Sequence, residues 1–261
     1  MFDFHMHSRV SFDGHDTGEA MAKAALAAGL KEICFTDHLD YDPLGKMGIL
    51  AFDTDVYNAE YDALEVPGLI IRRGMEFGMT ADNVAQFQKD LQRRNFDFVL
   101  GSVHFVDGLD VYFPEYWSDK TIFQAERRYL EATLECVKVH SDFDVLAHLT
   151  YIAKAQSHPS HRPVAFGEHR ELIDEILRIV ADKGKGLEMN TSGMDRCGAF
   201  LPTADMFRRF KELGGEIVTI GSDAHQAVRV GQYAFDVCDI FRDIFGYVCT
   251  FENRQPVFHK L

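Results

Sequence analysis

The succession of short apolar runs and helical patterns constrains the fold of this chain most. Runs that predict strands cover residues 2–6, 32–36, 69–75, 96–100, 143–147, 186–189 and 216–220. Patterns that predict helices lie between them, over residues 18–29, 81–94, 120–139, 167–183 and 203–213. Repeated strand-then-helix units favour a parallel sheet closed into a barrel. We therefore expect an α/β barrel, with residues 1–261 forming a single domain.

Two segments outside this alternation have their own predictions. Residues 247–261 are typical of a short terminal strand or hairpin. Residues 156–169 (QSHPSHRPVAFGEH) contain two prolines and no periodicity, so we expect a loop over the mouth of the barrel. Thr203 and Asp205, behind Pro202, are suited to begin the helix that follows them.

Charge and cysteine content exclude several classes of protein. The formal net charge of −14 opposes binding of a long nucleic acid, whereas cations bound in one pocket can still attract a small phosphorylated metabolite. Five scattered cysteines without a CxxC pair indicate reduced thiols. No apolar run reaches the roughly 20 residues that a membrane-spanning helix needs, and the N-terminus resembles no secretory signal. We expect a soluble, cytoplasmic protein that binds no membrane and no long nucleic acid.

Histidine and carboxylate side chains recur at or just beyond the carboxyl ends of the predicted strands. They are His5, His7, His15, His38, Glu76, His104, His148, Asp223 and His225. A single histidine in such a place is usually an ordinary hydrogen-bonded residue, but seven of the 12 histidines follow this pattern. Carboxyl ends of barrel strands meet at one rim. Imidazole and carboxylate ligands suit zinc, iron or manganese, and sites with two metal ions cleave phosphate esters.

These residues belong to short motifs that resemble the PHP family, named for polymerase and histidinol phosphatase. The motifs are HMHS (5–8), SFDGH (11–15), TDH (36–38), MEFG (75–78), GSVH (101–104), AHL (147–149), EMNTSG (188–193) and GSDAH (221–225). The histidinol-phosphatase branch is the most similar, through DFVLGSVHFVDG (97–108), KELGGEIVTIGSDAH (211–225) and FENRQP (251–256). The resemblance implies a distorted barrel of seven β/α units with a metal site at the carboxyl rim of its strands.

The resemblance also implies a centre of two or three divalent metal ions, zinc, iron or manganese. One ion would be held by His5, His7, Glu76 and Asp223, a second by Glu76, His104 and His148, and a third by His15, His38 and His225. The implied reaction is hydrolysis of a phosphomonoester by a metal-bridging hydroxide, with L-histidinol phosphate, an intermediate of histidine biosynthesis, as the expected substrate. Asp223, Glu76, His38 and His225 would be catalytic, and either His38 or His225 would protonate the leaving alkoxide.

The chain departs from the branch pattern after the AHL motif. Thr150 stands where an acidic residue is expected, and Lys154-Ala155 stands in place of an Arg-Tyr pair. Lysine lacks the two-pronged geometry of arginine, so another small phosphate, such as a nucleotide or sugar phosphate, is the alternative substrate. The residues predicted to bind the substrate are Arg196, Arg162, Arg9, Lys154 and Ser192.

Two other classes of function are less compatible with this sequence. A nucleic-acid-processing module, which PHP domains can form beside polymerases, is disfavoured by the acidity of the chain. A metal-binding regulatory protein without activity would be expected to lack ligands. All nine positions carry residues that can bind a metal.

Overall fold

Seven parallel strands form the centre of the molecule. The computed structural model describes residues 1–261. The strands follow one another in space as they do in the chain: β1 (Phe2–Met6), β2 (Glu32–Phe35), β5 (Ile70–Gly78), β6 (Phe98–Ser102), β9 (Val145–Leu146), β10 (Gly186–Asn190) and β11 (Val218–Gly221). Every neighbouring pair is parallel. The predicted seven-stranded barrel is therefore confirmed.

The sheet nearly closes where β11 returns to β1. The chain just beyond β11 reaches the end of β1 through a single parallel bridge between Met6 and Ala224. On either side of it, the Asp223 N–H donates to the His5 carbonyl (2.7 Å) and the His7 N–H to the Ala224 carbonyl (2.8 Å). This seam joins the two ends of the sheet and brings the first and last predicted metal ligands together.

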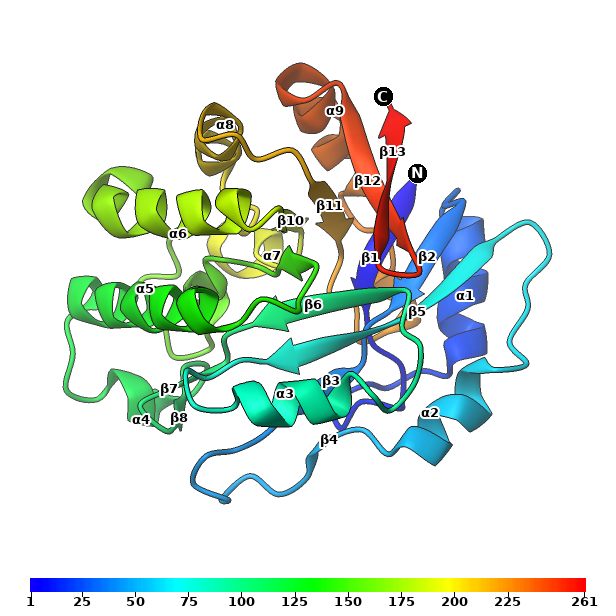
Figure 1. Ribbon diagram of the computed structural model, residues 1–261, viewed down its shortest axis with the longest axis horizontal. Coiled ribbons are helices and arrows are strands. Elements are labelled where there is room, and N and C mark those ends of the chain that lie inside the picture. The colour runs from blue at the N-terminus through cyan, green and yellow to red at the C-terminus, as the bar shows by residue number, and fades with distance from the viewer.

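Helices cover the outside of the sheet (Figure 1). They are α1 (Gly18–Ala27), α2 (Thr54–Tyr61), α3 (Val84–Asp90), α5 (Ile122–Val139), α6 (Arg170–Asp182), α8 (Ala204–Glu212) and α9 (Ala234–Ile244). Helices α5 and α6 lie side by side on one flank, and an exposed Lys138–Glu175 ion pair (2.7 Å) links them. Helix α5 begins at a capping box formed by Thr121 and Gln124.

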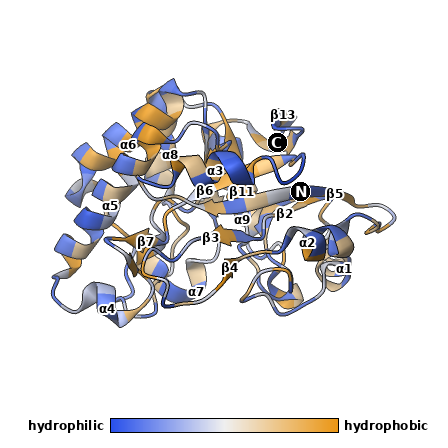
Figure 2. Ribbon diagram, turned by 60° about the horizontal axis from the view of Figure 1, so that its bottom comes forward, coloured by the Kyte–Doolittle hydropathy of each residue, from blue (hydrophilic) through white to orange (hydrophobic).

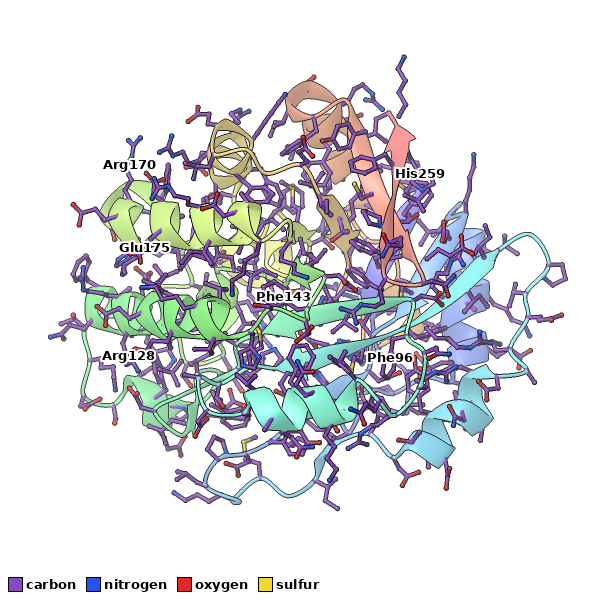
Figure 3. All side chains as sticks on the ribbon, in the orientation of Figure 1. Phe96, Arg128, Phe143, Arg170, Glu175 and His259 are labelled. Atoms are coloured by element: carbon purple, nitrogen blue, oxygen red, sulfur yellow. The ribbon has the colours of Figure 1, made fainter.

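Apolar residues are gathered between the helices and the sheet. Hydrophilic and hydrophobic positions alternate along α5 and α6 (Figure 2), as expected for helices with one face on a core. Phe96 and Phe143, which precede β6 and β9, are buried beside the sheet, whereas Arg128, Arg170 and Glu175 belong to these outer helices (Figure 3). No helix has the length and apolar character needed to cross a membrane.

The inside of the barrel is closed at the amino ends of the strands by the C-terminal hairpin of β12 (Tyr247–Glu252) and β13 (Gln255–Lys260). Phe251 packs with Phe4, Phe98 and other buried residues of the strands, and its ring centroid lies 4.7 Å from that of Phe98. Arg254 forms an ion pair with Asp144 at the start of β9. The hairpin predicted for the tail thus fills one end of the barrel and leaves the carboxyl end for the site.

Helices α2 and α9 and several short elements were not predicted. The short elements are β3 (His38–Asp40), β4 (Leu50–Ala51), β7 (Phe105–Val106), β8 (Leu109–Asp110), α4 (Pro114–Trp117), α7 (Met194–Cys197) and the 3-10 turns Tyr151–Lys154, Phe166–Glu168 and Ala227–Arg229. Helix α8 begins after Thr203 as expected, but the Thr203 hydroxyl bonds to the Asp205 carboxylate and caps no helix N–H.

Residues 156–169 do not cover the mouth of the barrel, contrary to our prediction. Glu126, buried on α5, holds this segment: its carboxylate lies 3.6 Å from His158 Nε2 and 3.0 Å from His169 Nε2. The His158 ring also packs edge-on against Trp117. A buried carboxylate requires such polar partners, so the loop packs against α5.

Candidate metal centre

The carboxyl ends of the strands surround a cavity of about 560 Å³. Predicted site residues that line it are His15, His38, Glu76, His104, His148, Lys154, Ser192, Arg196, Asp223 and His225. His5 and His7 lie directly beneath, fully buried at the end of β1. The barrel therefore brings residues that are up to 220 positions apart in sequence, from His5 to His225, to one place.

Glu76, at the end of β5, is the central carboxylate of the site. Five imidazoles face it: His148 Nε2 lies 2.8 Å from Oε1 and His104 Nε2 3.4 Å, while His38 Nδ1 (3.0 Å), His5 Nε2 (3.3 Å) and His7 Nε2 (3.5 Å) lie near Oε2. Burial alone would raise the pKa of Glu76, but the surrounding imidazoles hold this pKa well below its usual range. The carboxyl group is ionised and can bridge two cations.

The donor atoms form several overlapping groups, each small enough to hold one ion. These groups are His5–Glu76–His148, His5–His7–Asp223, His7–His38–His225 and His38–Asp40–His104, with all donor atoms of a group within 4.8 Å of one another. Burial and the neighbouring rings of His38 and His225 lower the pKa of His7 to about 3. His7 is therefore neutral, which is the form that binds a metal.

Unpaired buried atoms in the same place fit divalent cations. Atoms that are buried and accept or donate no hydrogen bond include His5 Nε2, His7 Nε2, His38 Nδ1, Glu76 Oε2 and His148 Nδ1. Each such atom costs about 1–3 kcal/mol unless something satisfies it, and most folded proteins contain few of them. Imidazole and carboxylate donors match zinc, manganese or iron, so the residues present fit this class of ion.

The arrangement of the predicted third ligand set differs from expectation. His38 and His225 both stack on His7, with ring centroids 4.2 Å from it in each case. His15 is exposed on the cavity wall, belongs to none of the donor groups, and is joined to His225 through its backbone N–H (3.0 Å to the carbonyl). The structure thus groups His7, and not His15, with His38 and His225.

Three carboxylates that our sequence analysis did not single out orient the imidazoles. Glu188 accepts a hydrogen bond from His5 Nδ1 (2.6 Å), Asp40 accepts one from His104 Nδ1 (3.0 Å), and Asp13 lies 3.2 Å from His225 Nε2. An ionised carboxylate can only accept, so in His5 and His104 it fixes the proton on Nδ1 and leaves Nε2 for a ligand bond. In His225 the Nδ1 lies 2.9 Å from the Asp223 carbonyl oxygen, and Asp13 faces the Nε2. Asp40 could have been found from the sequence, because it lies two residues after His38 and residues two apart share one face of a strand.

Two motif glycines make room for these carboxylates. A Cβ on Gly221 would lie 2.0 Å from Glu188 Oε1, and one on Gly78 would lie 1.8 Å from Asp40 Oδ1. The glycines of GSDAH and MEFG therefore matter because the orienting carboxylates approach the backbone closely.

Among the predicted substrate-binding residues, Lys154, Ser192 and Arg196 line the cavity. The Lys154 ammonium forms an ion pair with Asp223 and donates to Ser192 Oγ (2.9 Å). Arg196 donates to the Tyr112 hydroxyl (3.1 Å). Burial would raise the pKa of Asp223, but Lys154 and His5 hold it well below its usual range.

Arg9 and Arg162 lie outside the cavity, contrary to expectation. The Arg9 side chain is 59% exposed and pairs with Glu60 (2.8 Å). Arg162 pairs with Glu168 (2.9 Å) and Glu126 (3.2 Å) on the α5 side of the molecule. Their charges are thus compensated by local carboxylates away from the metal ligands.

Comparisons with known proteins agree with this geometry. The family model described as "PHP domain" matches residues 3–192. A histidinol-phosphatase of Lactococcus lactis is 32% identical over 231 residues, covering 87% of this chain and 85% of the relative. A probable histidinol-phosphatase of Clostridium acetobutylicum is 31% identical, covering 88% and 89%. The crystal structure of histidinol phosphate phosphatase from Lactococcus lactis, complexed with zinc, L-histidinol and phosphate, has a TM-score of 0.85 at 29% identity and covers 98% of both chains.

Proposed function

The chain belongs to the PHP domain family, and from this premise we propose that it is a metal-dependent phosphomonoesterase that hydrolyses L-histidinol phosphate to histidinol and phosphate. The family predicted from the motifs is confirmed. The observation that carries the proposal is the single ionised Glu76 carboxylate among five imidazoles at the carboxyl rim. The names of the relatives, and the zinc, L-histidinol and phosphate in the Lactococcus lactis structure, support this substrate. Such an enzyme serves histidine biosynthesis.

We infer that the donor groups hold two or three ions. His5, His7, Glu76 and Asp223 would hold one ion, and Glu76, His104 and His148 a second. His38 and His225 would hold a third, together with His7 or His15. Bound ions supply Lewis-acid activation of the phosphoryl group and of the attacking water.

Side chains of the cavity supply the remaining chemistry. Lys154 and Arg196 bring two positive charges to the cavity wall, and Ser192 offers a hydroxyl beside Lys154, so these three are suited to hold the phosphate oxygens. The leaving alkoxide needs a proton. If His38 or His225 gives this proton instead of binding an ion tightly, His225 is better placed, because 26% of its side chain is exposed compared with 9% for His38. Asp13 lies 3.2 Å from its Nε2.

The test is phosphate release by the purified protein from L-histidinol phosphate and from a panel of nucleotide and sugar phosphates. We expect strong preference for L-histidinol phosphate, loss of activity after chelation, and recovery with zinc, manganese or iron. Preference for a nucleotide or sugar phosphate would replace the proposed substrate by the alternative. Unchanged activity after complete metal removal would contradict the metal-dependent mechanism itself.

A further inference from the structure

Asp110 differs from every other acidic side chain of the cavity. The acidic residues that line it are Asp13, Asp40, Glu76, Asp110 and Asp223. All except Asp110 lie within 4 Å of an imidazole or of the Lys154 ammonium. Asp110 has no basic side chain within this distance. Its Oδ1 accepts a hydrogen bond only from the Tyr112 N–H (2.8 Å). Its Oδ2 accepts no hydrogen bond and is not fully buried. One carboxylate oxygen of the cavity wall is thus free for a ligand.

The backbone holds Asp110 in a fixed relation to the metal centre. It ends the hairpin of β7 and β8, which begins directly after His104, and Figure 1 shows this hairpin beside α4. Asp107 and Gly108 form its two-residue turn with positive φ values of 54° and 78°, the conformation that suits a tight hairpin. Phe105 pairs with Asp110, and the Val111 N–H donates to the His104 carbonyl (3.0 Å). Asp110 is therefore anchored next to a proposed metal ligand.

Asp110 also stands where the cavity meets a second one of about 410 Å³. Both cavities are lined by Met47, Phe105, Asp110 and Phe113. The second cavity adds the acidic residues Asp42 and Glu115 and one basic residue, Lys46. The free carboxylate thus lies on a wall that becomes more apolar with distance from the metal ligands.

Aromatic rings beside Asp110 add to its suitability for an organic cation. Tyr112, Phe113, Phe105 and Tyr151 line the same cavity. Ring faces attract ammonium and imidazolium groups, and a desolvated carboxylate binds them by charge-assisted hydrogen bonds. The basic side chains Lys154 and Arg196, by contrast, suit the phosphate. The cavity thus contains two basic side chains suited to the anionic part of a molecule and, paired with neither of them, one carboxylate suited to a cationic part.

We propose that Asp110 binds the positively charged nitrogen of the substrate and thereby selects phosphate esters of amino alcohols over uncharged phosphate esters. This inference rests on the proposed phosphatase function and names the residue that distinguishes its substrate. It also supplies an acidic partner that Thr150 does not provide, since Thr150 is buried and does not line the cavity.

The experiment compares Asp110→Asn with the unaltered protein on L-histidinol phosphate, phosphoethanolamine and p-nitrophenyl phosphate. Asparagine keeps the size of the side chain and an oxygen for the Tyr112 N–H. We expect kcat/KM to fall about 10- to 100-fold for the two cationic esters, mainly through KM, because a hydrogen bond to a charged group is lost. Activity on p-nitrophenyl phosphate should be retained. Glu115→Gln is the matched control, because Glu115 lines only the second cavity, and it should change none of the three activities.

The possible outcomes separate this inference from the proposed function. Equal losses on all three esters would overturn the role of Asp110, because the residue would then affect phosphate-ester hydrolysis in general or the folding of the protein. An unchanged preference for the cationic esters would overturn it as well. If the unaltered protein ignored L-histidinol phosphate but cleaved phosphoethanolamine in an Asp110-dependent way, the proposed substrate would fail while the inference held.

Discussion

At the scale of single residues, the carboxylates behind the imidazoles decide how well a metal is held. Glu188 accepts from His5 Nδ1 and from the His148 backbone N–H, so it fixes two residues of the His5–Glu76–His148 donor group at once. We expect Glu188→Gln to lower metal affinity about 10- to 100-fold, as is usual when an orienting carboxylate is lost. Metal titration of the chelated protein measures this. Affinity equal to that of the unaltered protein would mean that Glu188 does not orient His5.

A second prediction concerns two arginines that were both predicted to bind the substrate. Arg196→Ala should raise KM for a phosphate ester about 10- to 100-fold, because a charge-assisted hydrogen bond to phosphate is lost. Arg162→Ala should leave KM unchanged, since Arg162 pairs with Glu126 and Glu168 outside the cavity. Steady-state kinetics on both variants decide the matter. A KM effect of Arg162 as large as that of Arg196 would contradict this assignment.

Much of the site was predictable from residue type, and the rest depended on side-chain direction. Histidine and acidic residues at successive strand ends indicated which side chains would come together, because parallel strands place their ends on one rim. The pairing of His7 with His38 and His225 could not be predicted, since it depends on ring orientation. The same holds for Arg9, whose charge is compensated by Glu60, a residue 51 positions away.

At the scale of elements, helix α5 ends in a residue whose protonation should affect stability. His140 is buried, its Nε2 donates to the Thr80 carbonyl (2.8 Å), and burial lowers its pKa. The unfolded chain therefore takes up this proton first as the pH falls. The stability that the neutral ring contributes is present above its ordinary pKa of about 6.5 and declines below it.

The measurement is urea unfolding at about pH 7.5 and about pH 5.5, a range in which histidines change charge. The unaltered protein should lose more stability on acidification than His140→Gln, whose amide can still donate to Thr80. Equal losses in both proteins would show that another group is responsible. An NMR titration of the His140 ring gives a direct check, with its pKa expected below that of a free histidine.

The elements that were predicted from the sequence are longer than most of those that were missed, and the residues at their ends mark where they begin and end more clearly. Central strands are largely buried, β6 as a mainly apolar run and β1 as an alternating pattern, and they were predicted within about two residues at most ends. Strands β3, β4, β7 and β8 span only two or three residues, too few for any periodicity. Helix α9 is amphipathic, with Val237 and Phe241 buried, but no side chain caps its start, and Tyr233 precedes it with a positive φ.

At the scale of the whole molecule, bound metal should contribute to stability. Bound ions would satisfy unpaired buried atoms around Glu76, among them His5 Nε2, His7 Nε2 and Glu76 Oε2. Ions that bind only the folded chain stabilise it by about 2.7 kcal/mol at a hundredfold excess over Kd. For a chain of this size, chelation should therefore lower Tm by about 5 °C or more. Calorimetry with and without chelator measures the shift, and Glu76→Gln, which lacks the central carboxylate, should show a much smaller one.

The proposed metal centre lies across the seam between β1 and β11. His5 and His7 stand on one side of this joint and Asp223 and His225 on the other, and one bridge with two flanking backbone hydrogen bonds connects them. Ions shared by these residues would cross-link the first strand to the last. Transient opening of the barrel at this joint would then be coupled to metal release, so the occupied enzyme would resist local unfolding where its sheet is least continuous.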